Sequence, residues 1–445
     1  MITQNEINIA RHCISYAMAN GADAVRVSIS DSTMDGCTML NGVLDKVTHA
    51  ADRSVYLYLY ADRRYGTFST NRLEKEDLEM FIKQSVAMVK MLGEDECRSL
   101  PDPSRTAKDA VTGRELGLYD SRYEESDSDS RLTRAKQMSI CSKVASDDYQ
   151  LISEECEYSE SYDDNFTADS QGFEGRHTET CFSVFAEMTI QDKEGGKYSG
   201  FWWESSFDKD GVNLQGCSEK ALARAVRQIG PKKRRSGHYR MVVDTSVATK
   251  LISPILTALN AASIQQKMSF LDGTAGKKVF PEGMTLMDLA RTPRKNGSRL
   301  FDTEGVATKD SPIIENGVVK QYFVNTYMSA KMGIEPTVED ISRPCLLPIG
   351  EKELSLKDLL QMSGSGILVT GFNGGNCNPV TGDFSFGIEG FAFSRGKVTH
   401  PVREMLITGN MLELWNNLTA VGSDARPSVR WQIGSLAFDN VSFSA

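Results

Sequence analysis

Two short acidic segments, 301–305 and 381–387, hold the residues best suited to chemistry in this sequence. In the first, Asp302 and Glu304 stand two positions apart, so both carboxylates would project from one face if the segment were a strand. In the second, Asp383 directly follows a glycine. General acid–base catalysis uses two carboxylates in different surroundings, which these residues could supply. Capping of turns by Asp and Thr explains the same residues without any chemistry.

The sequence lacks other common catalytic motifs. None of its five histidines is followed by Glu, so there is no HExxH-type zinc motif. The glycines between 364 and 375 do not have the GxGxxG spacing, and Gly276-Lys277 is not part of a complete phosphate-binding loop. There is no GxSxG nucleophile elbow. The nine cysteines include no CxxC pair, which argues against a zinc ribbon and against a dithiol redox site.

Composition and charge exclude several protein classes. The chain has 445 residues, 25% of them charged and 40% hydrophobic, which is typical of a globular protein of two or three domains. Its formal net charge of −10 disfavours a dedicated nucleic-acid-binding protein. The one basic run, 232–235, is expected to be a solvated loop. On these grounds we expect no nucleic-acid partner.

Features of the sequence related to location predict a cytoplasmic protein. The odd number of scattered cysteines is typical of reduced thiols. Residues 1–6 have neither the basic nor the apolar region of a signal peptide. No apolar run reaches the eighteen residues of a membrane-spanning helix, so we expect no membrane segment.

Hydrophobic patterning predicts an α+β fold. Residues 1–95 are expected to form a small α+β unit, with a helix that starts at the Thr3–Glu6 capping box. Residues 96–230 are expected to combine a central helix with a β-meander, after a solvated acidic linker over 94–130. The predicted helices cover about 75–92, 130–145 and 218–229, and the predicted strands 25–29, 55–60, 149–158, 161–169, 180–191 and 198–205.

Residues 231–445 are expected to form a strand-rich C-terminal domain with inserted helices, after a junction at 230–233. Asn316-Gly317 predicts a hairpin turn, because both central residues of the favoured turn have positive φ. A helix is expected within 246–266, and Pro254 favours a start near that residue with Ser253 as the cap. Further elements are a capped helix at 355–362 and strands at 312–314, 318–324, 367–369, 384–393, 398–407 and 429–443.

Several segments, taken in order, carry a resemblance to one family. The chain resembles the TldD/PmbA family over nearly its whole length, and within it the PmbA (TldE)-like branch, often labelled modulator of DNA gyrase. The most specific segment is 381–387. The others are 21–28, 260–264, 269–271, 276–277, 301–306, 313–317, 390–391, 398–401, 407–410 and 421–424.

The resemblance implies one subunit of a two-subunit zinc peptidase that acts on small or unfolded peptides. In this family a TldD-like subunit carries HExxxH on a helix, with a Cys ligand near its C-terminus, and the PmbA-like subunit lacks that motif. Here the corresponding helix, 246–266, contains no His, Cys, Asp or Glu, and no Cys follows Cys377. We therefore expect no catalytic residue, metal or cofactor in this chain, and zinc only in a TldD-like partner.

Two other functions stay open from the residues alone. One is a non-proteolytic binding or scaffold protein associated with gyrase or an antitoxin, and the other is an independent hydrolase that uses carboxylates. The resemblance also implies that the isolated chain can self-associate as a homodimer. If the chain contributes to a peptide cleft, glycines and strands in the two acidic segments could admit an extended peptide, although tight turns explain the same glycines equally well. The residues expected at that cleft are Phe301, Asp302, Glu304, Gly305, Thr381, Gly382, Asp383, Ser385 and Gly387.

Overall fold

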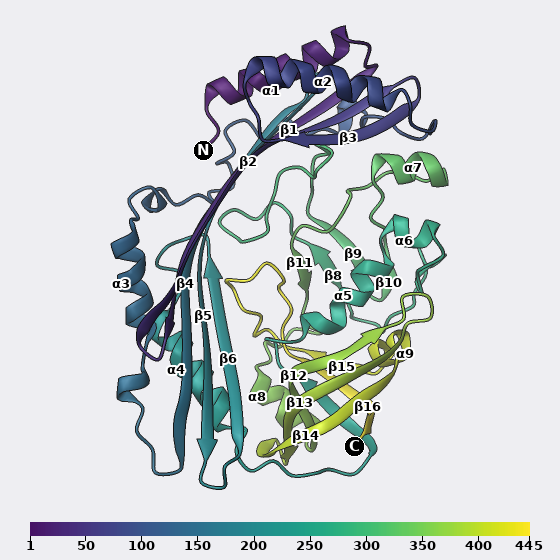
Figure 1. Ribbon diagram of the computed structural model, residues 1–445. Helices are drawn as coiled ribbons and strands as arrows, with labels where there is room; N and C mark the ends of the chain where they lie inside the picture. Colours follow the sequence, from purple (N-terminus) through teal and green to yellow (C-terminus); the bar gives the residue numbers. More distant parts are fainter.

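A long twisted sheet runs along one side of the molecule and faces a strand-rich C-terminal region (Figure 1). The structure is a computed structural model that describes residues 1–445. Helices pack on the sheets and between strands, so the predicted α+β class and the strand-rich C-terminal region are confirmed.

The long sheet has six antiparallel strands in the order β3-β2-β1-β4-β5-β6, and it unites strands from 1–95 with strands from 96–230. The prediction of separate strands at 149–158 and 161–169 was wrong, because the alternation of side chains continues unbroken through residues 159 and 160 and gives one strand. The strands are β1 (Ala24–Leu40), β2 (Val43–Ala61), β3 (Arg64–Thr70), β4 (Tyr149–Asp169), β5 (Glu174–Asp192) and β6 (Lys197–Ser206).

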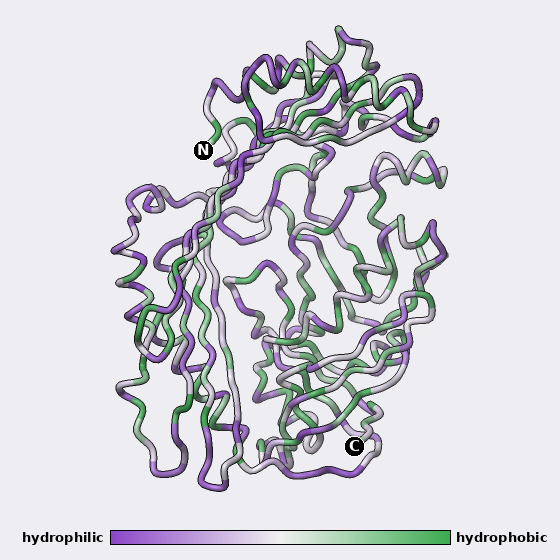
Figure 2. The backbone as a smooth tube through the Cα atoms, viewed as in Figure 1, coloured by the Kyte–Doolittle hydropathy of each residue, from purple (hydrophilic) through white to green (hydrophobic).

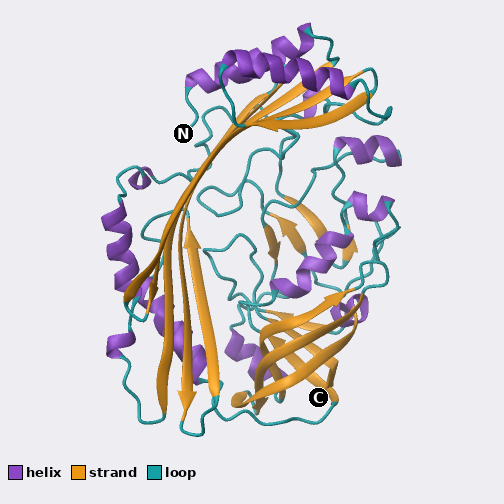
Figure 3. Ribbon diagram, in the orientation of Figure 1, coloured by secondary structure: helices purple, strands orange, loops and turns teal.

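Two pairs of helices cover the outer face of this sheet, at its two ends (Figure 3). The predicted capping box forms at the start of α1, where the Thr3 amide donates to Glu6 Oε2 at 2.6 Å. Val25, Val27 and Ile29 pack against α1 and α2, so their polar neighbours on β1 face the C-terminal region. The helices are α1 (Gln4–Ala19) and α2 (Lys75–Val89) at one end, and α3 (Ser128–Met138) and α4 (Leu214–Val226) at the other.

The segment 94–130 is more than the solvated linker that its charge predicts. Ala107, Leu116 and Leu118 are buried against Phe173 and Leu300. Its backbone also accepts hydrogen bonds from β5 and donates one to Gly305. This segment therefore ties the long sheet to the C-terminal region. Two short 3-10 helices, η1 (Pro103–Arg105) and η2 (Ser121–Tyr123), lie in it, and η3 (Cys141–Lys143) follows α3.

The C-terminal sheet has the order β14-β13-β12-β7-β16-β15, and an additional pairing between β14 and β16 closes it on itself. It encloses most of a core of 38 buried residues. The strands of the C-terminal sheet are β7 (Gly237–Val243), β12 (Gly366–Cys377), β13 (Asp383–Ser394), β14 (Lys397–Asn410), β15 (Leu418–Val421) and β16 (Leu436–Ser444).

In the long sheet, hydrophilic segments concentrate at the turns that end the strands β4 to β6 (Figure 2).

A smaller sheet, in the order β10-β9-β8-β11, lies between the two large ones in space (Figure 1), and in the chain its strands come between β7 and β12 of the C-terminal sheet. The predicted turn is confirmed, with φ of 51° at Asn316 and 80° at Gly317. The predicted strand 318–324 is only two residues long, and 429–443 forms a strand only from Leu436. These strands are β8 (Leu286–Asp288), β9 (Ser311–Glu315), β10 (Val318–Val319) and β11 (Pro344–Leu346).

The helix expected within 246–266 is two helices, and its predicted start at Pro254 was wrong. α5 begins at Thr249 and contains Pro254, because the burial of Leu251 and Ile255 offsets the one backbone hydrogen bond that proline removes. Asn260 then caps a second helix through its side chain. The helices of this region are α5 (Thr249–Ala258), α6 (Ala261–Gln265), α7 (Thr326–Met332), α8 (Leu356–Ser363) and α9 (Met411–Asn416).

Candidate functional site

Two adjoining cavities lie between β6 and the closed C-terminal sheet, and together we call them the trough. They share the lining residues Phe201, Gly371 and Glu389. The wider cavity, with a volume of about 730 Å³, lies beside the start of α5, and the narrower one, with about 80 Å³, lies beside α4. A cavity of the wider one's size accommodates a ligand or a short peptide segment.

The start of α5 contributes one wall of the wider cavity. Lys250 and Ser253 line it, because residues three positions apart share one side of a helix, and Ser246 lines it from the turn just before α5. The opposite side of α5 carries Leu251 and Ile255, which are fully buried in the core. This sequence therefore folds α5 with one apolar face for packing and one polar face for the trough.

β6 contributes the facing wall. It is the last strand of the long sheet, and Phe201 and Trp203, two positions apart, both line the wider cavity. Their side chains are 51% and 38% exposed. Large aromatic side chains with this exposure provide apolar contact area for a ligand.

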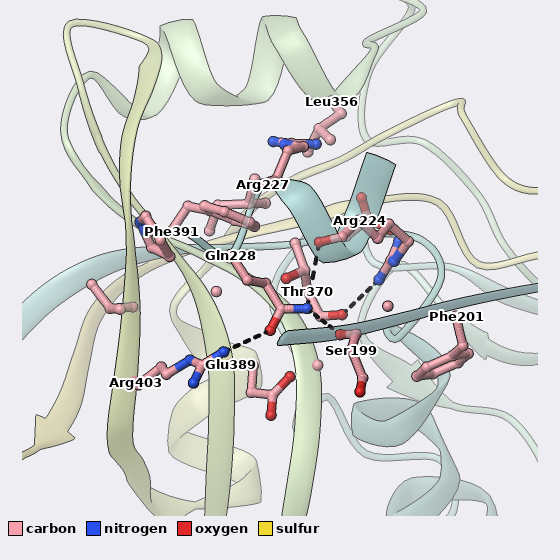
Figure 4. Close-up of a pocket in the computed structure, with 17 residues that line it drawn as sticks. Ser199, Phe201, Arg224, Arg227, Gln228, Leu356, Thr370, Glu389, Phe391 and Arg403 are labelled. Carbon is pink, nitrogen blue, oxygen red and sulfur yellow. Dashed lines mark hydrogen bonds between the residues drawn. The ribbon is translucent and has the colours of Figure 1, made fainter. Parts of the chain in front are cut away.

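Cationic side chains surround both cavities. In the narrower cavity, Arg224 Nη2 donates to the Thr370 carbonyl at 2.9 Å, and Arg403 Nη2 donates to Gln228 Oε1 at 3.2 Å (Figure 4). In the wider cavity, Arg426 donates to the Trp203 carbonyl and lies over the rings of Trp202 and Trp203. The cations that line the trough are Arg224, Arg227, Lys250, Arg403, Arg426 and Arg430.

None of these six cations forms an ion pair with a carboxylate of the chain. Burial lowers the pKa of Arg224 and also that of Arg426, which shows that their guanidinium groups are incompletely solvated. The trough has only two carboxylates, Asp244 and Glu389. Asp244 Oδ1 already accepts from the amide and hydroxyl of Ser246. The trough is therefore a positively charged site.

The segment 301–305 is a turn, so its two carboxylates do not project from one face of a strand. Asp302 is 2% exposed, and its oxygens accept from the amides of Glu304 at 2.9 Å, Val306 at 3.0 Å and Glu339 at 3.0 Å. Burial raises the pKa of Asp302 to about 6. The Glu304 carboxylate accepts from the amide and hydroxyl of Thr326. Both acids are thus occupied in holding the backbone.

The other predicted residues of this segment are also closely packed. Gly305 has a φ of 89°, and a Cβ there would lie 2.5 Å from the Phe173 ring. Phe301 and Asp302 line a separate cavity of about 560 Å³ on the inner face of the long sheet, together with Tyr58. Arg430 lines both this cavity and the trough.

The segment 381–387 lies at the start of β13, and no residue of it lines the cavity that contains Phe301. Asp383 is exposed and accepts from the Thr381 hydroxyl at 2.6 Å and from Asn410 Nδ2 at 3.0 Å, and these hydrogen bonds lower its pKa. Gly382 has a φ of 78°, and Ser385 is exposed. A Cβ at Gly387 would lie 2.2 Å from Asn373 Oδ1, and Asn373 lines the trough. The structure does not bring the two predicted segments together.

Sequence reasoning missed the trough. Its cations come from α4, α5, β14 and the segment 426–430, and no short motif contains them. The only local signal is the spacing of three residues between Arg224, in the last turn of α4, and Arg227, the C-cap residue of that helix. No group of three or more His, Cys, Asp or Glu side chains is arranged to hold a metal ion.

Comparisons with known proteins give one consistent family. Residues 25–89, 121–229 and 236–445 match the profiles of domain 1, the central domain and the C-terminal domain of PmbA/TldA metallopeptidases. A solved structure from Bacteroides thetaiotaomicron, described as a modulator of DNA gyrase, is 38% identical over 100% of both chains, with a TM-score of 0.94.

Two further relatives are consistent with this family. A metalloprotease PmbA homolog from Haemophilus influenzae is 26% identical over 90% of this chain and 88% of its own. The structure of TldE from Thermococcus kodakarensis is 19% identical over 98% of this chain and 100% of its own, with a TM-score of 0.81, and so shares the fold. No helix of this chain is both long enough and apolar enough to cross a membrane.

Proposed function

The chain belongs to the PmbA/TldD metallopeptidase family, and from that premise we propose that it is the non-metal-binding subunit of a two-subunit zinc peptidase. The observation that carries this proposal is the polar face of α5. A zinc site uses His, Cys, Asp or Glu ligands, whereas this face offers Thr249, Lys250 and Ser253, and the turn before it offers Ser246. Hydroxyls and an ammonium group do not fit a zinc ion, so we derive no metal chemistry in this chain.

Its role in the complex is to hold and orient a peptide beside a TldD-like subunit that carries zinc. The trough supports this role through its size, its aromatic side chains and its cationic groups. Binding that aligns a substrate lowers the barrier to its reaction without any chemical group from this chain. The substrates we propose are small or unfolded peptides in the cytoplasm.

Reconstitution with the TldD-like homologue of the same organism tests the proposal. We expect hydrolysis of an unfolded peptide only when both chains are present, and no stoichiometric zinc in this chain alone by elemental analysis. If this chain alone bound one zinc per molecule and cleaved the peptide, the proposal would be wrong. If the two chains associated without any gain in hydrolysis, the non-proteolytic scaffold function would replace it.

A further inference from the structure

The trough is a positively charged site in an acidic molecule. Six cationic side chains and two carboxylates line it, in a chain whose formal net charge is −10. Most of its cations lie over aromatic rings, for example Arg227 over Phe391 at 4.8 Å and Arg403 over Tyr198 at 4.6 Å. These contacts hold the cations in place and leave their charges without a carboxylate partner. A negatively charged ligand would supply the missing partners.

The outer edge of β6, which pairs with no other strand, borders the same site. β6 is the last strand of its sheet, and its outer edge uses two carbonyls to accept from side chains: Ser199 from Gln228 Nε2 at 2.5 Å, and Trp203 from Arg426. The N–H and C=O groups of alternate residues point to the same edge. Those of Phe201, midway between the two, therefore also point outward. An edge of this kind pairs with an extended peptide.

We propose that the trough binds an extended acidic peptide segment, which pairs with β6 at Phe201 and places Asp or Glu side chains against Arg227, Lys250 and Arg403. This inference rests on the proposed function and adds the chemical class of the peptide. A nucleic acid would also supply negative charge, but it has no backbone that pairs with a strand edge.

Binding by the isolated chain tests the inference without the partner subunit. The probes are two fluorescent peptides of equal length, one with alternating Glu and Val, and the other with Gln in place of Glu. We expect the Glu peptide to bind about tenfold more tightly at low salt, the scale expected of a few partly exposed ion pairs. The preference should shrink as salt is added. Equal binding of the two peptides would overturn the inference.

A matched pair of triple variants locates the site. Arg227→Gln, Lys250→Gln and Arg403→Gln together should abolish the preference for Glu. Arg72→Gln, Lys75→Gln and Lys267→Gln remove the same charge from side chains that are 74%, 74% and 80% exposed elsewhere, and should leave the preference unchanged. An equal loss in both triple variants would show a general charge effect and contradict the inference. Displacement of the peptide by a single-stranded oligonucleotide with higher affinity would assign the trough to nucleic acid instead.

The strand edge has its own control. Phe201→Pro removes the outward N–H, and an edge strand tolerates proline where the N–H faces away from the sheet. Phe201→Ala removes the ring and keeps the N–H. We expect the Pro variant to bind the Glu peptide several-fold more weakly than the Ala variant, with equal circular dichroism for both. Equal affinities in folded variants would exclude the strand pairing. If the reconstituted pair cleaves peptides without any preference for Glu, this inference fails while the proposed function stands.

Discussion

The segment 301–305 and the trough differ in how their charged groups are satisfied. Asp302 and Glu304 accept five hydrogen bonds from backbone amides and a hydroxyl of their own chain. The trough cations contact carbonyls and aromatic rings but no carboxylate. A carboxylate whose hydrogen bonds are all made within the chain stabilises the fold. A cation that has no carboxylate partner in the chain is instead available to a negatively charged ligand.

The largest effect expected from this comparison is on stability at Asp302. Asp302→Ala leaves three backbone amides without an acceptor in a buried site. We expect the free energy of unfolding to fall by about 4 kcal/mol, since each buried unsatisfied group costs about 1–3 kcal/mol. Urea denaturation measures the change. Asp383→Ala is the control, because that exposed carboxylate accepts only from side chains; equal losses in the two variants would contradict the distinction.

A second effect concerns a cation that does have a partner. Arg176 donates to both oxygens of the fully buried Asp164, at 2.9 and 2.5 Å. Arg176→Gln leaves that carboxylate without its cation, so we expect a loss of about 3 kcal/mol in the free energy of unfolding. Arg11 makes the same two-point contact with Glu174 at the surface, and Arg11→Gln should destabilise far less. Similar losses in the free energy of unfolding for the two variants would show that burial of the ion pair does not determine how much it stabilises the fold.

The dependence of stability on pH sharpens the account of Asp302. Burial raises its pKa from 3.8 to about 6, so between these values the folded state binds more protons than the unfolded state. Asp302 therefore makes stability fall as pH rises from about 4 to about 6, by at most about 1.4 kcal/mol per pH unit. Urea titrations across this range should show that fall in the wild type relative to Asp302→Asn. Parallel pH profiles for the two proteins would contradict it.

The smallest effect on stability is expected in the trough. Arg227→Gln removes a cation that has no carboxylate partner, so the free energy of unfolding should change by no more than about 0.5 kcal/mol. The midpoint of urea denaturation checks this. A loss as large as that of Arg176→Gln would mean that the trough cations stabilise the fold and would remove the contrast between the two regions.

Local elements were largely predictable because their signals lie within a few residues. The Thr3–Glu6 capping box, the Asn316-Gly317 turn and the Ser355 cap all depend on neighbours in the chain, and all three form. Errors arose where packing competed with local preference. Pro254 lies inside α5 because buried neighbours hold the helix together, and 94–130 is anchored because distant strands cover its small apolar residues.

The candidate site itself was not predicted from the sequence. The turn-capping alternative for the acidic segments describes Asp302 and Glu304 as the structure shows them. Whether any residue of these segments contacts a peptide stays a prediction. The trough could not be predicted, because its members are isolated Arg and Lys residues that resemble ordinary surface charges in the sequence.

By itself the sequence determined the family, the α+β class and the absence of zinc ligands from the helix 246–266, since these depend on residue identity and order. Only the tertiary structure decided that α4, α5, β14 and the segment 426–430 surround one cavity. The physical reason is that caps and turns form between neighbours along the chain. The position of one cation relative to another is set instead by how the long sheet packs against the closed sheet.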